Sequence, residues 1–202
     1  MRPGRLVVLE GGEASGKSTQ AALLAARLDA VLTREPGGTP VGEAIRRLLL
    51  DPANAGLEPR AEALLMLAAR AEHVAALIEP SLRSGRDVVC DRFSGSTLAY
   101  QGWGRGLAVE DLRSLSAWAS AGREPDLVVL LGVRAAVAAA RQAGRGGGDR
   151  LEEAGREFFD KVEQGFAALA AEDPERWVVV DGEGTPEEVG ERIASVVAGR
   201  LG

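Results

Sequence analysis

An octapeptide near the start of the chain restricts the possible folds more than any other feature. It fits the pattern G-x-x-x-x-G-K-[ST] and reads Gly11-Gly12-Glu13-Ala14-Ser15-Gly16-Lys17-Ser18. Only two of the 24 basic residues of the chain are lysines, and one of them is Lys17. The apolar run Leu6–Glu10 precedes the octapeptide and the helical pattern Ser18–Leu28 follows it, the order expected of a phosphate-binding loop. A glycine-rich turn without a ligand is the alternative, but this context favours a nucleotide-binding loop.

Composition excludes several classes of protein. The net charge of −6 at pH 7 argues against non-specific nucleic-acid binding, which needs a basic surface. A lone cysteine, Cys90, excludes an internal disulfide and fits a reducing compartment. The apolar run behind the basic start ends at Glu10, too early for a signal peptide or a membrane span. We therefore expect a cytoplasmic protein that binds neither nucleic acid nor membrane.

Five short apolar runs separated by helical patterns predict an α/β fold. This alternation is typical of a parallel sheet covered by helices on both faces. With no internal repeat or linker, residues 1–202 are expected to form a single domain. The predicted strands are Leu6–Leu9, Ala30–Thr33, Asp87–Cys90, Leu127–Leu131 and Trp177–Val180.

Helix limits are marked by capping residues. Thr39 followed by Pro40 predicts a helix start, and Thr185-Pro186-Glu187-Glu188 adds the glutamate of a capping box. Helical spacing continues from Pro59, and we expect a kink or break at Pro80.

Four glycines lie among two arginines and an aspartate between Gly144 and Arg150. Such a segment cannot pack well and is predicted to be mobile. A surface loop without function is one interpretation. The arginines of a nucleotide-binding protein favour the other, a lid over phosphates at about residues 141–152.

Further segments indicate a family. Together with the phosphate loop, and in order from about Leu6 to Asp181, the chain resembles the thymidylate kinases. The segments that carry the resemblance are Thr33-Arg34-Glu35-Pro36-Gly37-Gly38-Thr39, Asp91-Arg92-Phe93, Ser96–Gly102, Glu124–Leu127 and Asp149–Glu152. The resemblance implies a three-layer α/β/α fold of the nucleoside-monophosphate-kinase type with a five-stranded parallel sheet. It also implies transfer of phosphate from ATP to dTMP with Mg²⁺, by a homodimer.

The residues themselves support phosphoryl transfer. Backbone N–H groups of the loop and the following helix N-terminus can cradle the β-phosphate of ATP, and Lys17 can bridge the β- and γ-phosphates. The Ser18 hydroxyl is placed for Mg²⁺, and Asp91, after an apolar strand, is a second candidate near the metal. Capping of the next turn is the alternative role of Asp91. The predicted ATP site comprises Gly11, Gly12, Glu13, Ala14, Ser15, Gly16, Lys17, Ser18, Thr19 and Arg141.

The resemblance assigns one part of the dTMP site to its phosphate and sugar. Arg92 matches the arginine that binds the acceptor phosphate. Glu13 matches an acidic residue near the sugar 3′-hydroxyl, and Tyr100 with Gln101 matches the positions where the deoxyribose packs.

The rest of the predicted dTMP site receives the base. Arg70 matches the arginine that hydrogen-bonds a thymine carbonyl, and Thr97 falls where a small polar residue contacts N3. Pro36 of the Arg-Glu-Pro-Gly-Gly-Thr segment is included. Met66 departs from the family, because an aromatic residue usually stacks on the base there, although a thioether can also pack on a ring.

The lid is expected to supply a catalytic arginine. Ala14 stands where one type of family member has an arginine in the phosphate loop. Arg141 and Arg145 correspond to lid arginines near ATP, and Arg145 is the predicted catalytic one. The predicted catalytic set is Lys17, Glu13, Arg145 and Arg150.

Other residues receive structural interpretations. His73 is predicted to be structural or solvent-facing, because no carboxylate or cysteine lies at a suitable spacing. The tryptophans Trp103, Trp118 and Trp177 are expected in the core or an interface. Gly132 ends the fourth predicted strand where the family usually has an aspartate.

Two alternative functions remain open from the sequence. One is a kinase for a related nucleotide or nucleoside on the same fold. The other is a regulatory ATPase that switches a protein partner, although a switch needs no second nucleotide pocket. The long apolar helix Ala61–Leu77 could supply the homodimer interface.

Overall fold

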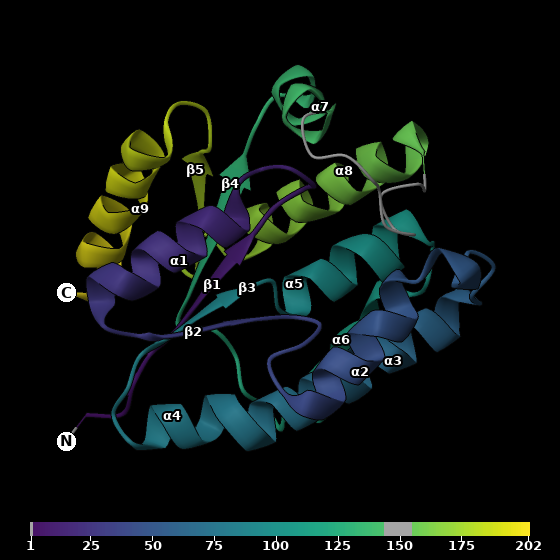
Figure 1. The fold of residues 1–202 in the computed structure, drawn as a ribbon, viewed down its shortest axis with the longest axis horizontal. Coiled ribbons are helices and arrows are strands. Elements are labelled where there is room, and N and C mark those ends of the chain that lie inside the picture. Colours follow the sequence, from purple (N-terminus) through teal and green to yellow (C-terminus); the bar gives the residue numbers. More distant parts are fainter. Residues whose placement is uncertain (1, 144–154) are drawn as a thin grey trace.

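The described residues, 2–143 and 155–202, of the computed structural model form one five-stranded parallel sheet (Figure 1). The strand order is β2-β3-β1-β4-β5. Each strand lies within one residue of its predicted limits: β1 Leu6–Glu10, β2 Val31–Arg34, β3 Val88–Asp91, β4 Leu127–Gly132 and β5 Trp177–Asp181. The α/β prediction is confirmed.

Burial explains why the strands were readable in the sequence. All of β1 is buried, whereas the edge strands β2 and β5 are only partly covered. The inner strands therefore need apolar side chains on both faces, which gives continuous apolar runs. Leu6 of β1 pairs with Val88 of β3, and Val7 pairs with Leu127 of β4.

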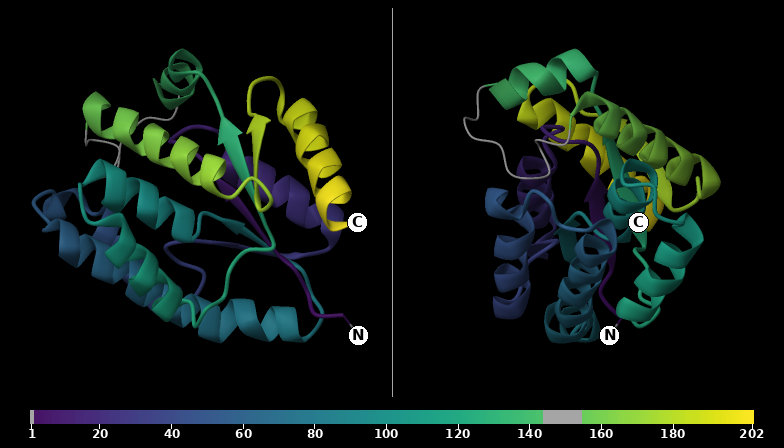
Figure 2. Two further views of the ribbon diagram at one scale, coloured as in Figure 1. Left: turned by 180° about the vertical axis from the view of Figure 1, so that it is seen from behind. Right: turned by 90° about the vertical axis from the view of Figure 1, so that its right-hand side faces the viewer.

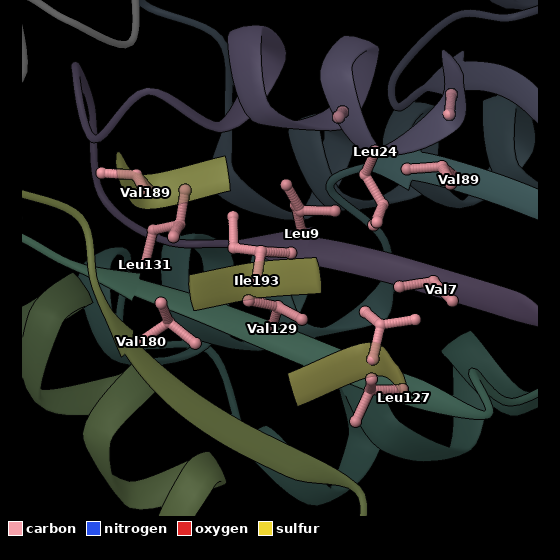
Figure 3. Packing of buried hydrophobic residues seen from close by; sticks show 13 residues of the cluster. Val7, Leu9, Leu24, Val89, Leu127, Val129, Leu131, Val180, Val189 and Ile193 are labelled. Atoms are coloured by element: carbon pink, nitrogen blue, oxygen red, sulfur yellow. The ribbon is translucent and has the colours of Figure 1, made fainter. Parts of the chain in front are cut away.

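Helices α1 (Lys17–Leu28) and α9 (Pro186–Leu201) cover one face of the sheet. Leu24 of α1 and Ile193 of α9 pack around Leu9 and Val129 of the inner strands (Figure 3). Leu9, Val129 and Ile193 are each 0% exposed. Truncating such a side chain to alanine typically costs about 2–5 kcal/mol of stability.

The opposite face carries two smaller clusters. In one, Leu82 of α4 (Glu79–Arg83) and Val74 lie against Val8 of β1. In the other, Val162 of α8 (Arg156–Glu172) lies with Leu130 of β4. Seen from behind, α8 and α6 (Val109–Ala119) lie in front of the sheet and α1 behind it (Figure 2). The three-layer α/β/α arrangement is confirmed.

The predicted helix starts are confirmed. At α2 (Pro40–Leu50) the Thr39 hydroxyl accepts a hydrogen bond from the Gly42 N–H at 3.0 Å. At α9, Thr185 and Glu188 form the reciprocal capping box. The other α-helices are α3 Pro59–His73, α5 Ser94–Thr97 and α7 Ala135–Ala143. A short 3₁₀ turn, Pro52–Asn54, follows α2, and a π-helical segment, Leu98–Gly104, follows α5.

Of the kink or break predicted at Pro80, the break is wrong, because the chain stays helical there. The π-helical segment Val74–Ile78 widens the helix just before α4, and the Glu79 N–H bonds the Val74 carbonyl. Pro80 is the second residue of α4 and follows the π-helical segment directly. Within the described part of the chain, no helix combines the length and apolar composition needed to cross a bilayer.

Candidate active site

The candidate site lies where β1, β2 and β3 end, beside the glycine-rich loop that joins β1 to α1. Loops that follow neighbouring parallel strands meet at one edge of a sheet, the usual place for a ligand. Gly11 has φ +146°, and a Cβ there would stand 2.8 Å from the Leu131 carbonyl oxygen. The loop therefore passes so close to β4 that only glycine fits.

Lys17 is anchored inside this loop. Its Nζ donates to the Gly12 carbonyl at 2.6 Å and to the Ser15 hydroxyl at 3.2 Å. Burial, helped by the positive charge of Arg92, lowers the pKa of Lys17 from 10.5 to about 8. Lys17, Ser18 and Arg92 line a cleft of about 560 Å³. A buried ammonium facing this cleft can attract an anion strongly.

Ser18 and Asp91 meet at the floor of this cleft. The Ser18 hydroxyl donates to Asp91 Oδ2 at 2.5 Å. Asp91 Oδ1 is buried and has no hydrogen-bond partner among the described residues. A hydroxyl beside a carboxylate with an unused oxygen fits Mg²⁺, which takes one or two protein oxygens and completes its shell with phosphate and water. The described residues contain no group of three or more His, Cys, Asp or Glu side chains placed to hold a metal ion.

The alternative role of Asp91 as a cap is not observed, because Glu10 serves the next turn instead. Glu10 Oε1 accepts the backbone N–H groups of Phe93 and Ser96, each at 2.9 Å. Its other oxygen accepts the Ser96 hydroxyl at 2.6 Å. Burial raises the pKa of Glu10, although these hydrogen bonds and Arg92 oppose it. The sequence signal for Glu10 was an acid closing an apolar strand.

A second, narrower pocket of about 100 Å³ adjoins the cleft. It contains every residue predicted to bind dTMP, namely Glu13, Pro36, Met66, Arg70, Arg92, Thr97, Tyr100 and Gln101. Residues not predicted also line it: Glu35, Arg46, Leu50, Phe93 and Ser96. The pocket and the cleft share Glu13, Glu35, Arg46 and Arg92. The two spaces are therefore adjacent, with these four residues between them.

Arg92 is held by neighbours on several sides. Its guanidinium lies 2.5 Å from Glu13 Oε1 and donates to the Gly11 carbonyl and the Ser96 hydroxyl, each at 3.1 Å. The Tyr100 hydroxyl donates to Glu13 Oε1 at 2.6 Å, and the Arg92 guanidinium lies over the Tyr100 ring. Burial alone would lower the pKa of Arg92, but Glu13 together with Tyr100, Asp91 and Glu10 outweighs burial, and the pKa is raised. Arg92 is therefore a permanent, oriented cation.

Arg70 is buried at the far end of the pocket. Its side chain is 2% exposed, and its Nε donates to Glu35 Oε2 at 2.8 Å. Its Nη2 donates to the Thr97 hydroxyl at 2.9 Å, so the two residues predicted to read the base are in contact. The guanidinium also lies 5.1 Å from the centre of the Phe93 ring.

Of the two predicted interpretations of His73, structural or solvent-facing, the structure supports the structural one, and a carboxylate partner that was not expected lies beside the ring. Its side chain is 0% exposed and its Nδ1 lies 3.2 Å from Glu35 Oε1. Its Nε2 lies 2.6 Å from the Thr33 hydroxyl. Spacing along the chain could not reveal Glu35, which comes from the loop after β2.

Gln101 and Pro36 are also held in place. The Gln101 amide donates to Glu62 Oε1 at 2.8 Å, and Glu62 is fully buried. Arg46 donates to the Pro36 carbonyl at 3.0 Å. Arg46 was missed because one arginine on an amphipathic helix gives no distinct sequence signal.

Arg141 lies on the other side of the phosphate loop. It donates to the Ser15 carbonyl at 3.3 Å and to the Gly182 carbonyl at 3.0 Å. A pocket of about 320 Å³ next to it is lined by Ala14, Gly16, Thr19 and Arg141, four of the residues predicted to bind ATP. Arg145 and Arg150 lie outside the described residues.

Four residues outside the site also have defined places. Trp103 and Trp177 pack against apolar clusters, whereas Trp118 is 82% exposed. Cys90 is a buried strand residue, as expected.

The Gly132 carbonyl accepts the Gly182 N–H at 2.8 Å, so this departure from the family still joins β4 to the loop after β5.

Comparisons with known proteins agree on one family. A model of the family described as thymidylate kinase matches residues 9–193. A thymidylate kinase from Synechococcus sp. (strain JA-3-3Ab) is 51% identical, with 96% of each chain covered. One from Rhizorhabdus wittichii is 48% identical, with 98% of this chain and 99% of the relative covered. The crystal structure of thymidylate kinase from Ehrlichia chaffeensis superposes with a TM-score of 0.79 at 31% identity, covering 96% and 100% of the chains.

Proposed function

The chain belongs to the thymidylate kinase family and is an ATP:dTMP phosphotransferase, and on this basis we propose which of its residues bind and transfer the phosphoryl group. The proposal depends chiefly on one observation. All eight residues expected around dTMP line one pocket, and that pocket shares Glu13 and Arg92 with the cleft over the phosphate loop. Donor and acceptor can thus meet in line, which phosphoryl transfer requires.

On the donor side, the loop backbone and Lys17 hold the phosphates of ATP. The N–H groups at the start of α1 favour negative charge, and Lys17 adds a compact cation among them. Arg141 is anchored to the Ser15 carbonyl, beside the pocket that we assign to the rest of ATP. Arg145 is proposed to meet the charge that develops on the transferring group, with Arg150 as a second lid arginine.

Ser18 and Asp91 are proposed to hold Mg²⁺. The unpartnered Oδ1 of Asp91 and the adjacent Ser18 hydroxyl are oxygen donors suited to this ion. Bound Mg²⁺ supplies positive charge to the phosphates of ATP.

On the acceptor side, Arg92 is proposed to bind the phosphate of dTMP. In this structure its Nη1 donates to Gly11 and Ser96 and its Nη2 to Glu13 and Tyr100, so an incoming phosphate would replace one or more of these acceptors. Unlike a lysine, the planar guanidinium can donate two N–H groups to one phosphate once they are released. Glu13, next to it, is assigned to the sugar 3′-hydroxyl, and Tyr100 and Gln101 to the face of the deoxyribose. The Glu13 carboxylate also orients Arg92, so one acid would position both the sugar 3′-hydroxyl and the arginine that binds the acceptor phosphate.

The thymine base is assigned to the inner end of the pocket. Arg70 donates to a base carbonyl and Thr97 lies beside it for N3, while Met66 and Pro36 provide apolar contact. A regulatory ATPase would have no use for this second pocket, so the pocket favours a kinase.

We also propose a homodimer that uses α2, α3 and α6. Helix α3 packs against both α2 and α6. Exposed apolar side chains on these helices are Val41, Leu48, Leu64, Leu115 and Trp118. Covering them with a second copy would remove an apolar surface from water. In sedimentation velocity the chain should run as a dimer and Leu64→Asp should shift it toward monomer; a monomeric wild-type chain would contradict the proposal. A cytoplasmic location stays a prediction.

A nucleotide panel tests the acceptor assignment. Turnover with ATP is measured for dTMP, dUMP, UMP, CMP and thymidine, and we expect the highest kcat/KM with dTMP. Arg70→Ala should raise the KM for dTMP with little change in the KM for ATP. Arg27→Ala removes a surface ion pair with Glu191 and serves as the matched control. A KM for dTMP that is unchanged in Arg70→Ala would contradict the assignment of the base.

A further inference from the structure

A buried chain of polar contacts lies behind Arg70. It runs from the Thr33 hydroxyl to His73 Nε2 at 2.6 Å, and from His73 Nδ1 to Glu35 Oε1 at 3.2 Å. Glu35 Oε2 then accepts Arg70 Nε at 2.8 Å. The side chains of Glu35, Arg70 and His73 are 5%, 2% and 0% exposed, so water competes little for these bonds.

The two oxygens of Glu35 are divided between two partners. Arg70 uses Oε2, and His73 faces Oε1. A carboxylate that accepts bonds at both oxygens cannot turn about its last torsion without breaking one of them. Because an ionised carboxylate only accepts, the proton in the contact with Oε1 belongs to His73 Nδ1.

The imidazole ring is itself fixed from the other side. Thr33, on β2, holds Nε2, and Gly38 closes over the ring edge with φ +79°. A Cβ at Gly38 would stand 2.5 Å from His73 Nε2 and 2.6 Å from the Thr33 hydroxyl. The loop after β2 therefore leaves the ring no room to move.

We propose that His73 is a positioning residue for dTMP, which holds Glu35 so that Glu35 aims the Arg70 guanidinium into the acceptor pocket. His73 does not line the pocket with Arg70 and Glu35, so it acts through them. The inference rests on the proposed role of Arg70 in binding the base.

This role explains why buried charges are placed at this point. Arg70 is held by three partners at once, because Nε donates to Glu35, Nη1 to Ser116 and Nη2 to Thr97. Of these three partners, only Glu35 carries a charge opposite to that of the guanidinium. A guanidinium fixed before the ligand arrives loses less conformational entropy on binding. Binding of dTMP is therefore favoured by a residue that does not touch it.

Two variants of similar shape separate this role from simple packing. His73→Asn keeps an N–H close to the position of Nδ1, whereas His73→Leu has no donor. We expect His73→Leu to raise the KM for dTMP about tenfold, as for loss of one hydrogen bond to a charged group, with the KM for ATP within about twofold. His73→Asn should recover most of that loss. Assays are run well below the unfolding temperature of each variant.

The Arg70→Ala background separates failure of this inference from failure of the proposed function. There, His73→Leu should add no further increase in the KM for dTMP, because its target is gone. If Arg70→Ala raises the KM for dTMP and His73→Leu does not, the positioning role is wrong and the base assignment stands. If Arg70→Ala has no effect, the base assignment itself is wrong. Equal losses in the Asn and Leu variants would also overturn the positioning role.

A spectroscopic readout needs no turnover. The chain has one histidine, so its ¹⁵N ring signals are assigned without further variants. Adding dTMP should shift the His73 Nδ1 signal along the dTMP binding curve in the wild-type protein. The same dTMP concentration should leave the signal unmoved in Arg70→Ala. If the His73 ring signals of the wild-type protein do not change when dTMP is added, the proposed coupling between His73 and the dTMP site is contradicted.

Discussion

Replacing Arg92 by alanine tests the division of the site into donor and acceptor halves. Arg92 Nη2 contacts Glu13 at 2.5 Å, and Nη1 donates to the Gly11 carbonyl and the Ser96 hydroxyl at 3.1 Å. These contacts hold the side chain in one orientation before the phosphate of dTMP arrives, which lowers the conformational entropy lost on binding. A hydrogen bond to a charged group is worth about 1.5–3 kcal/mol, which is roughly a 10- to 150-fold change in affinity.

The assay measures kcat and KM for each substrate with the other saturating. We expect Arg92→Ala to raise the KM for dTMP by roughly 10- to 150-fold and the KM for ATP by less than about threefold. Arg92→Lys keeps the charge but not the planar pair of donors, and should fall between the wild type and alanine. Arg27→Ala, on the surface, should leave both constants unchanged. Equal effects of Arg92→Ala on both nucleotides would refute its assignment to the acceptor phosphate.

Three further predictions concern the donor side and the base. The Lys17 pKa of about 8 implies that the positive charge is present below pH 8 and is lost as the pH rises through 8, so kcat/KM for ATP should fall above that pH. A wild-type pH profile that stays flat to pH 10 would contradict this role. Lys17→Ala should lose almost all turnover while keeping a normal far-UV circular dichroism spectrum. Arg145→Ala should cut kcat by roughly 10³-fold, measured in single-turnover experiments. If Arg145→Ala is nearly silent and Arg141→Ala is severe, the choice of Arg145 as the catalytic arginine is wrong. Met66→Phe should tighten dTMP by up to about 1 kcal/mol in calorimetry if it stacks on the base, and weaker binding would mean that the pocket is shaped around methionine.

The strands could be predicted from the sequence because burial on both faces produces continuous runs of apolar residues. An inner parallel strand has no polar face, so Leu6–Glu10 and Leu127–Gly132 stand out as apolar runs. A break was expected at Pro80 because proline lacks the backbone N–H of an interior helical residue. The chain instead stays helical through the π-helical segment and α4. The π-helical segment before Pro80 is a packing outcome that local propensity does not reveal.

The acceptor pocket was predictable through resemblance, whereas its supporting residues were not. Arg92 and Tyr100 lie in segments that carry the resemblance, and Arg70 was matched to the family as a single residue. Glu10 and His73 act on backbone or on other side chains, and their partners lie far away in the chain. Such contacts depend on how elements far apart in the chain, such as β1 and the turn after β3, pack together, and spacing along the sequence does not record this. Arg145 and Arg150 stay predictions.

The end of β3 shows how one strand can serve both substrates. Asp91 and Arg92 are neighbours, yet Asp91 faces Ser18 of the phosphate loop while Arg92 reaches Glu13 and Tyr100 of the acceptor pocket. Arg92 has φ +70°, a left-handed conformation that costs an arginine energy and is often found at functional sites. The backbone N–H groups of Phe93 and Ser96 both donate to the Glu10 carboxylate, which holds the backbone after Arg92 in place. The turn after Asp91 thus places the oxygen proposed to bind Mg²⁺ and the cation proposed to bind the acceptor phosphate on successive residues.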